Sequence, residues 1–429
     1  VARVAGDTPL PDDVLAQIVA KSDGVPLFVE ELTKTVVESG AETANAIPDT
    51  LQDSLMARLD RLSPVKEVAQ MGACIGREFS YELLAAVSGL HDNELQNSLT
   101  ELTSSGLVFR HGNPPEASYV FKHALVQDAA YESLLRSTRQ QRHTAIAEAL
   151  EARFPDQVSS QPELVAHHYT RAGLAARALP FWLRAGEHAV AQFANQEAIS
   201  HLEQGLGLLT QTPNTEDRAR NEIALRLALG PALIIVHEYV GPEIEANFKA
   251  LRVASERVAD SSGLAAAFLG LHRMLIVSGE LIEGHELDLE NLRLAESLGD
   301  DRLLTTARWA LGASHLWLGH FVTARDLSRA AFRELTFEDD QSFIASHLEA
   351  PGVTCRCFNA YANLLLGYPE KAQELMSDAV GLAERHEHPF VIAFAHFFDG
   401  VAHWLRGEAS STLRAADAVS ALCAEHEMP

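Results

Sequence analysis

The chain has 429 residues, more than one hydrophobic core usually organises and enough for two or three domains. Hydrophobic residues make up 47% and charged residues 22%, the composition of an ordinary soluble globular protein, and no apolar run approaches the roughly 18–20 residues that span a bilayer. The formal net charge of −25 repels nucleic-acid phosphates and anionic lipid headgroups, so it argues against DNA or membrane binding by the chain as a whole.

The chain begins with Val1, and no charged segment followed by an apolar one predicts a secretion signal. The missing initiator Met fits a piece of a longer polypeptide, although tag removal or processing would look the same. Four cysteines are too few for a disulfide scaffold, and Cys355-x-Cys357 has no second Cys or His pair at zinc spacing. We therefore expect reduced thiols, no metal site and a cytoplasmic protein.

Residues 11–40 predict two helices separated by a break. Asp12 and Asp13 suit the positive end of a helix dipole, and apolar residues recur at helical spacing over 14–19. The run Asp23-Gly24-Val25-Pro26 ends this helix. The apolar stripe of the next helix is Phe28, Leu32 and Val36.

The second segment predicts several helices and then a β-hairpin. Apolar residues recur at helical spacing over 51–62, 68–75, 83–87 and 94–102. Two short apolar runs, 106–109 and 119–121, flank a Gly/Pro-rich turn, which is typical of a hairpin. Helices followed by a hairpin are the pattern of a winged-helix domain. One long helix is expected after it, over residues 125–154.

From about residue 161 onward the sequence predicts only helices, and they repeat. Four glycines, Gly279, Gly319, Gly367 and Gly407, are separated by steps of 40, 48 and 40 residues. Five residues after each glycine stands a small residue: Gly284, Ala324, Ala372 and Thr412. Eight residues after each stands an apolar residue: Leu287, Leu327, Leu375 and Ala415. Seven residues before three of them stands another small residue, Gly312, Ala360 and Gly400, whereas His272 occupies this position before Gly279. Gly241 indicates an earlier, weaker copy. Antiparallel helix pairs turning at the glycines predict an α-solenoid.

Three segments resemble a known family. Gly24-Val-Pro-Leu-Phe-Val-Glu-Glu-Leu32 is similar to the end of the nucleotide-binding module of STAND/AAA-type signalling ATPases. Ile47-Pro-Asp-Thr-Leu-Gln-Asp-Ser-Leu-Met-Ala-Arg-Leu-Asp-Arg-Leu62 resembles the entry to their winged-helix domain, and Tyr119-Val-Phe-Lys-His-Ala-Leu-Val-Gln-Asp-Ala-Ala-Tyr-Glu-Ser-Leu-Leu135 the segment that leaves it. With the repeats, this combination looks most like bacterial multidomain proteins that carry a class III adenylate/guanylate cyclase domain in front of the ATPase module. The likeness is close over 20–155 and looser across the repeats.

The resemblance implies a mostly α fold in three parts. These are the C-terminal end of an ATPase module over 1–45, a winged-helix-like domain over 46–155 and a tetratricopeptide-like α-solenoid over 156–429. In the family, the proline of a Gly-x-Pro motif packs near the adenine of bound nucleotide. The resemblance therefore implies that Gly24 and Pro26 contribute to a nucleotide site here. In some relatives a histidine of the winged-helix domain contacts the nucleotide phosphates. The resemblance implies this role for His123. The sequence contains no Gly-Lys dipeptide and hence no P-loop. Binding of ATP or ADP would therefore require the P-loop half of the ATPase module, upstream of this segment.

Each candidate also has a plain structural explanation. Gly24-x-Pro26 is an ordinary helix break, and His123 beside Phe121 suits a core histidine. The histidines at 167, 168, 386, 388 and 396 lie among predicted repeats, where packing or surface roles are commoner than metal binding. The motifs H-E-x-x-H and G-x-S-x-G are absent, and we expect no catalytic residue in this segment.

Two functional hypotheses follow. In the first, the solenoid binds a protein or peptide on its concave face, and the winged-helix-like domain relays this to the ATPase core and an upstream adenylate cyclase domain. In the second, the chain is the sensor segment of a STAND-type transcription regulator. Residues 47–140 contain eight Lys/Arg against twelve Asp/Glu, whereas a DNA-binding wing is normally basic, so nucleic acid is the less expected partner.

Overall fold

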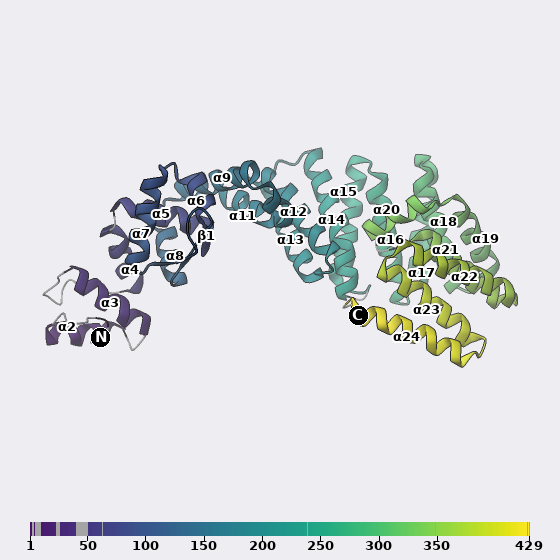
Figure 1. Cartoon of the computed structure of the whole chain (residues 1–429). Coiled ribbons are helices and arrows are strands. Elements are labelled where there is room, and N and C mark those ends of the chain that lie inside the picture. The colour runs from purple at the N-terminus through teal and green to yellow at the C-terminus, as the bar shows by residue number, and fades with distance from the viewer. Residues whose placement is uncertain are drawn as a thin grey trace. The chain divides into compact units, whose positions relative to one another are not determined.

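The structure is a computed structural model that describes residues 1, 4, 10–22, 26–39, 50–61, 63–237, 239–347, 349–426 and 428. The chain divides into two compact units, Val1–Ala178 and Leu179–Pro429. Helices dominate both, and the strands that the structure describes form one small sheet in the first unit (Figure 1). The predicted mostly α fold is confirmed. The expected domain boundaries at 45/46 and 155/156 remain predictions.

The first unit opens with a pair of helices, α2 (Asp12–Ser22) and α3 (Pro26–Ser39). The predicted break therefore lies where expected, with Pro26 as the first residue of α3, a position where its missing N–H costs nothing. The two helices share a small apolar core built from the predicted stripes. Its buried members are Val14, Ile18, Leu32 and Val36.

A winged-helix arrangement follows. Its elements are α4 (Leu51–Arg61), α5 (Ser63–Ile75), β1 (Glu78–Ser80), α6 (Tyr81–Ser88), α7 (Asp92–Ser104), β2 (Val108–His111) and β3 (Ser118–Phe121). The strands form an antiparallel sheet in the order β1-β3-β2, with Phe79 opposite Tyr119 and Phe109 opposite Val120. Phe79, Tyr119 and Phe121 are buried, and the rings of Phe79 and Tyr119 stack 5.7 Å apart. The predicted hairpin is thus confirmed, and β1 is an addition to it.

The single long helix expected over 125–154 is wrong. The structure has α8 (Ala124–Glu132) and α9 (Arg136–Arg153), with Leu135 in an extended conformation between them. The Ser133 hydroxyl donates to the carbonyl of Ala130 and accepts from the Gln70 amide. This side-chain bond competes with the helical ladder, and the break lets Leu134 turn into the core, where it is buried.

The rest of the described chain is helical. The remaining elements are α10 (Pro155–Ser160), α11 (Pro162–Ala172), α12 (Ala175–Ala191), α13 (Asn195–Leu208), the 3₁₀ turn η2 (Leu209–Gln211), α14 (Glu216–His237), α15 (Pro242–Val258), α16 (Ser261–Val277), α17 (Leu281–Leu298), α18 (Asp301–Trp317), α19 (Phe321–Glu334), α20 (Phe337–His347), α21 (Pro351–Leu365), α22 (Pro369–His386), α23 (Pro389–Leu405) and α24 (Ala409–Glu425). Neighbouring helices pack in pairs, α14 with α15, α16 with α17, α18 with α19, α21 with α22 and α23 with α24. The predicted solenoid of helix pairs is confirmed.

The four predicted glycines make the turns inside the pairs. Gly279, Gly319, Gly367 and Gly407 have φ between +76° and +88°, the left-handed region where glycine lacks the steric penalty of other residues. Gly241 lies between α14 and α15, as the earlier copy requires, but its φ of 163° is extended. The left-handed residue of that turn is Tyr239, with φ of 70°. The first repeat therefore turns differently from the other four.

The small residues seven before the anchors bring the paired helices close. A Cβ added at Gly312 would lie 3.4 Å from the Cβ of Leu327, and one at Gly400 would lie 3.2 Å from the Cβ of Ala415. The positions five after the anchors are buried at Gly284, Ala324 and Ala372. The paired antiparallel helices therefore approach closely at these small residues, as predicted.

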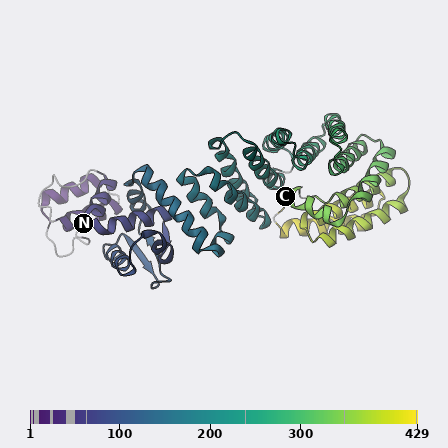
Figure 2. The ribbon, with the colours of Figure 1, turned by 90° about the horizontal axis from the view of Figure 1, so that it is seen from above.

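The 48-residue step between Gly319 and Gly367 contains the additional helix α20. It packs against α14, α16 and α21, so it lies on the side of the first helices of the pairs. Seen from above, α14 to α24 curve round so that the C-terminal end returns towards α14 (Figure 2). Ring contacts close this curve: Phe193 with His426 at 5.5 Å and Tyr239 with Phe390 at 6.2 Å.

We predict that Gly270→Ala destabilises the second unit. A Cβ at Gly270, in α16, would overlap the buried ring of Phe248 in α15, so α15 and α16 would have to separate at a cost of about 1–3 kcal/mol. The matched control is Gly381→Ala, mid-helix in α22 with open space around its Cβ, which should be neutral or stabilise by up to about 1 kcal/mol. All four tryptophans lie in the second unit, so urea unfolding followed by tryptophan fluorescence measures both changes. Equal effects of the two substitutions would contradict the packing argument.

Candidate functional site

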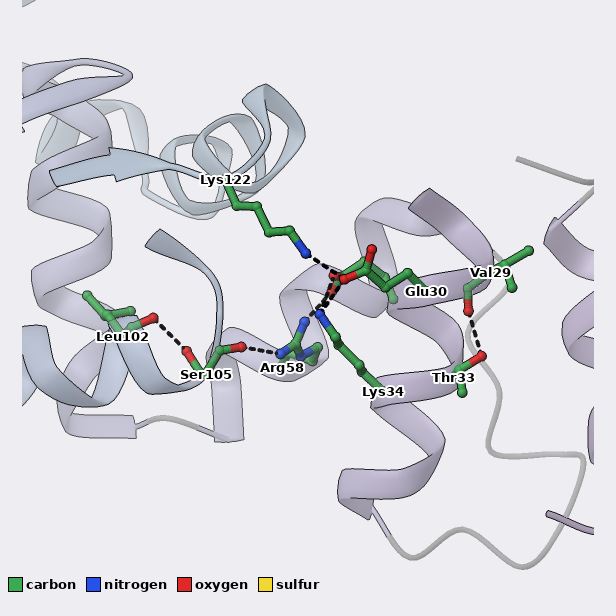
Figure 3. Close-up of polar contacts among 9 residues, drawn as sticks. Val29, Glu30, Thr33, Lys34, Arg58, Leu102, Ser105 and Lys122 are labelled. Carbon is green, nitrogen blue, oxygen red and sulfur yellow. Dashed lines mark hydrogen bonds and ion pairs between the residues drawn. The ribbon is translucent and has the colours of Figure 1, made fainter. Parts of the chain in front are cut away.

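The three segments that resemble a known family meet at one group of charged side chains in the first unit. Glu30 and Glu31 come from α3, Arg58 from α4 and Lys122 from the residue after β3, with Lys34 of α3 beside them (Figure 3). We call these five residues the junction cluster. Their formal charges sum to +1 in a chain whose net charge is −25.

The centre of the junction cluster is a buried ion pair. Glu31 and Arg58 are each 2% exposed and hydrogen-bonded to each other through Glu31 Oε2 and Arg58 Nη1. Arg58 Nη2 donates a second bond of 2.8 Å to the carbonyl oxygen of Ser105, which ends α7 (Figure 3). One guanidinium therefore joins α3, α4 and the end of α7. Two charges removed from water are stable only when both are paired in this way.

Glu30 connects α3 to the sheet. Its Oε1 accepts from Lys34 Nζ at 2.6 Å, one helical turn away, and from Lys122 Nζ (Figure 3). The hydrogen bonds from Lys122 and then Lys34 lower the pKa of the Glu30 carboxyl to about 2, and the bond to Glu30 raises the pKa of Lys122. The carboxylate form is thus favoured, and it links α3 to the residue that follows the hairpin.

The predicted site residues lie next to the cluster rather than in it. Pro26 is exposed and begins α3, one turn before Glu30. His123 is half-buried at the N-cap of α8, directly after Lys122, and its side chain makes no capping bond. Gly24 lies outside the described residues. The roles of all three in nucleotide binding stay predictions. The signal that sequence reasoning passed over is the adjacent acid pair Glu30-Glu31 in the first of the three segments.

A second polar group in the first unit is a set of stacked histidines. Tyr131 Oη lies 3.0 Å from His143 Nε2, and His143 Nδ1 lies 2.9 Å from His168 Nδ1, with the His167 ring alongside. In a hydrogen bond between two Nδ1 atoms one nitrogen donates its proton and the other accepts with its lone pair, so the accepting ring has to be neutral. Burial, with nearby positive charge, lowers the pKa of His143 to about 4 and that of His168 to about 3. These contacts join α8, α9 and α11.

The second unit presents a row of exposed apolar side chains. Two residues before each anchor glycine, and last in its helix, stands an apolar residue: Val277, Trp317, Leu365 and Leu405. Their exposed fractions are 53%, 40%, 41% and 41%. We call these four residues the terminal row. One equivalent apolar position left uncovered in four successive repeats is a regular surface feature, unlike the scattered exposed residues that any protein has.

The described residues contain neither a candidate metal site nor a membrane-spanning helix. Within the described ranges, no group of three or more His, Cys, Asp or Glu side chains is arranged to hold a metal ion. None of the helices in the described part of the chain combines the length and the apolar character needed to cross a membrane.

No protein-family model matches the chain. An uncharacterized protein of Rhizobium meliloti (strain 1021) is 30% identical over 222 residues, which is 50% of this chain and 22% of that protein. The matched part of the chain thus spans about a fifth of that relative's length.

Solved structures with similar helical arrangements include Rap proteins and a STAND protein. The apo form of RapI has a TM-score of 0.48 at 10% identity and covers 97% of this chain and 99% of its own. The Rap conjugation gene regulator of plasmid pLS20, in complex with the Phr* peptide, has a TM-score of 0.45 at 16% identity and covers 68% of this chain and 80% of its own. The STAND protein of Pyrococcus horikoshii with a tetratricopeptide repeat sensor has a TM-score of 0.36 at 13% identity and covers 98% of this chain and 71% of its own.

The structure defines the class of protein: a winged-helix-like domain with a β-hairpin, followed by an α-solenoid of tetratricopeptide-like helix pairs.

We predict that Arg58→Met destabilises the first unit by about 3–5 kcal/mol, because Glu31 would remain buried without its partner. Hydrogen exchange should accelerate in peptides from α3 and α4. The double variant Glu31→Gln/Arg58→Met leaves no charge behind and should cost less than Arg58→Met alone. Lys66→Met, which breaks the more exposed pair with Asp60, serves as control and should change stability by less than about 1 kcal/mol. An Arg58→Met variant as stable as this control would exclude a structural role for the pair.

We also predict that acid weakens the first unit through the histidine set. The folded state lowers the pKa of His143 and His168 below the ordinary value of about 6.5, so the unfolded state binds more protons below that pH. Stability is full above about pH 7 and is lost as the pH falls from 6.5 towards 4, by about 2 kcal/mol or more at pH 5. Circular dichroism melts at pH 7.5 and 5.0 measure this, and tryptophan fluorescence identifies the second unit's transition.

The control for this loss replaces the two buried rings. His143→Phe/His168→Leu should reduce the difference between the two pH values, whereas His111→Gln, at an exposed strand end, should leave it unchanged. An unaltered pH dependence in the double variant would assign the acid sensitivity to other groups.

Proposed function

We propose that the chain is the regulatory, protein-interaction segment of a larger signalling protein. The observation that carries the proposal is the terminal row, because four repeats leave the same apolar position uncovered at one end of their first helices. A protein or peptide that covers these side chains would remove them from water, which is the main favourable contribution to most protein association.

The charge of the second unit suggests the partner's chemistry. Residues 179–429 contain 19 Lys/Arg and 35 Asp/Glu, so their net charge is 19 − 35 = −16. A partner with an apolar face flanked by basic residues would be attracted to the terminal row, whereas an acidic one would be repelled. The same charge disfavours nucleic acid as the partner.

The junction cluster supports the proposed signalling role of the first unit. It joins the three segments that resemble STAND ATPases, so a change in the position of α3 would have to break or rearrange the bonds of Glu30 and Glu31. In this proposal an upstream ATPase half completes a site for ATP or ADP beside Gly24, Pro26 and His123. The output is cyclic nucleotide synthesis by an upstream adenylate cyclase domain, as the sequence resemblance implies.

The alternative is the sensor segment of a STAND-type transcription regulator. The helix before the hairpin, α7, contains Asp92, Glu94 and Glu101 and no Lys or Arg, which is unfavourable next to DNA phosphates. This favours the first proposal over direct DNA contact by the winged-helix-like domain. A domain that binds DNA elsewhere in the longer protein would favour the alternative.

We predict that Leu365→Glu/Leu405→Glu abolishes regulation, since charge at two row positions should weaken partner binding by about 2 kcal/mol or more. The measurement is cyclic AMP production by the intact natural polypeptide in its own cells, compared with a deletion of residues 1–429. The double variant should shift production in the same direction as the deletion. Leu413→Glu is the matched control, because Leu413 is 65% exposed in α24 but lies outside the row.

The outcomes separate the parts of the proposal. Production that is absent in every form contradicts the cyclase output. Production that changes on deletion but not in the double variant contradicts the terminal row as the regulatory surface. Leu413→Glu behaving as the double variant does would mean that any added charge on the second unit disturbs regulation.

A further inference from the structure

The second unit contains an apolar cavity of about 580 Å³, partly open to solvent, on the inner side of its curve. The first helices of the pairs, α14, α16, α18, α21 and α23, provide most of its wall, and α24 provides part of the rest. Eight aromatic side chains line it: Tyr239, Trp309, Trp317, Phe358, Phe390, Phe394, Phe397 and Phe398. A cavity of this size with a mainly apolar wall and few polar groups has the properties of a small-molecule site.

The wall also contains one buried ion pair. Arg273 of α16 pairs with Glu349, which lies in the connection between α20 and α21 and is 9% exposed. Thr354 Oγ1 donates to Glu349 Oε1 at 3.2 Å, and the Arg273 guanidinium lies 5.4 Å from the centre of the Tyr239 ring. The inserted helix α20 thus leads directly to the residue that neutralises Arg273. The polar part of the cavity is net neutral.

We infer that this cavity binds a small, mostly apolar, uncharged organic molecule that carries one or two hydrogen-bonding groups such as a carbonyl or hydroxyl. The apolar body lies among the aromatic rings, and the polar group faces the Arg273–Glu349 pair. The inference goes beyond the proposed function, because its ligand is a small molecule and not a protein. Two residues of the terminal row, Val277 and Trp317, also line this cavity.

The volume sets the size of the ligand. An apolar protein cavity of about 150 Å³ holds benzene, with six non-hydrogen atoms. By the same proportion, 580 Å³ holds roughly 20 non-hydrogen atoms, the size of two or three linked rings. A single amino-acid side chain is too small to fill this space.

The wall chemistry disfavours an extended peptide inside the cavity. Each residue of a peptide backbone brings one N–H and one C=O group that need partners when removed from water. Besides the pair of Arg273 and Glu349, the charged or hydroxyl-bearing residues in the lining are Tyr239, His272 and Thr354. These are too few for several residues of backbone, whereas one or two polar groups can be satisfied.

The ion pair disfavours a charged ligand. An anion that bound Arg273 would displace Glu349 and leave a carboxylate buried without its partner, and a cation that bound Glu349 would do the same to Arg273. An uncharged group can accept from the guanidinium or donate to the carboxylate while the pair stays intact.

The test uses the full 429-residue chain and two dyes with the same ring system. N-phenyl-1-naphthylamine is uncharged, has one N–H group and is close to the expected size, and 8-anilinonaphthalene-1-sulfonate is its anionic counterpart. We expect the uncharged dye to bind in a one-to-one complex, roughly tenfold or more tightly than the anionic one. Equal or tighter binding of the anionic dye overturns the uncharged class, and no binding of either dye overturns the site.

Cys423 reports where the dye binds. It lines the cavity and is half-buried, whereas Cys74, Cys355 and Cys357 are buried. Saturating uncharged dye should slow alkylation of Cys423 by N-ethylmaleimide roughly tenfold, as measured by mass spectrometry of the peptide. Dye that binds without protecting Cys423 lies on another apolar surface, which contradicts the inference.

A matched pair of variants completes the test. Val277 lines the cavity and is 53% exposed, and Val253 of α15 is 58% exposed and does not line it. Val277→Trp should fill part of the cavity and weaken dye binding roughly tenfold, whereas Val253→Trp should leave it unchanged. Equal binding by both variants overturns the inference. These measurements need no cyclic nucleotide output, so their failure is distinguishable from failure of the proposed function.

Discussion

The second unit depends on one constraint, the left-handed turn that joins the two helices of a pair. At φ near +80° a side chain would strain the backbone, so a glycine at this point fixes where each first helix ends. The residue two positions earlier is then the last of its helix and remains partly uncovered, which produces the terminal row. The same turn sends the second helix back along the first, so successive first helices face the inner side and build the cavity wall. Both proposed binding surfaces therefore follow from one repeated backbone conformation.

Some of these features could be predicted from the sequence, and others could not. The turn glycines, the small residues that let helices approach, the break before Pro26 and the hairpin were all predictable, because each depends on residues close together in the chain. Strand β1 was not, since three residues carry too little pattern and its pairing with β3 joins positions about 40 apart. The break between α8 and α9 was missed because the bond from Gln70 to Ser133 joins distant residues. Helix α20 was visible only as eight additional residues in the repeat.

The sites show the same limit. The family resemblance directed attention to Gly24, Pro26 and His123, while the described contacts are made by their neighbours Glu30, Glu31 and Lys122 together with Arg58. The pairing of a buried acid in α3 with a buried arginine in α4 depends on how the helices pack. Helical spacing alone shows only that Glu30 and Lys34 lie one turn apart. The inner cavity was not foreseen, because its wall comes from five first helices whose apolar positions read as ordinary core.

The terminal row and the cavity are not independent surfaces. Val277 and Trp317 belong to both, since each ends a first helix and each lines the cavity. A molecule in the cavity and a protein on the row would therefore touch the same two side chains. If contact with these two side chains makes one binding event change the free energy of the other, thermodynamic linkage requires the two changes to be equal. The ring contact between Tyr239 and Phe390 adds a physical route, because it joins the first and last repeats beside the cavity. A ligand that favours the closed curve would fix the spacing of the row and so select which partner the row can bind.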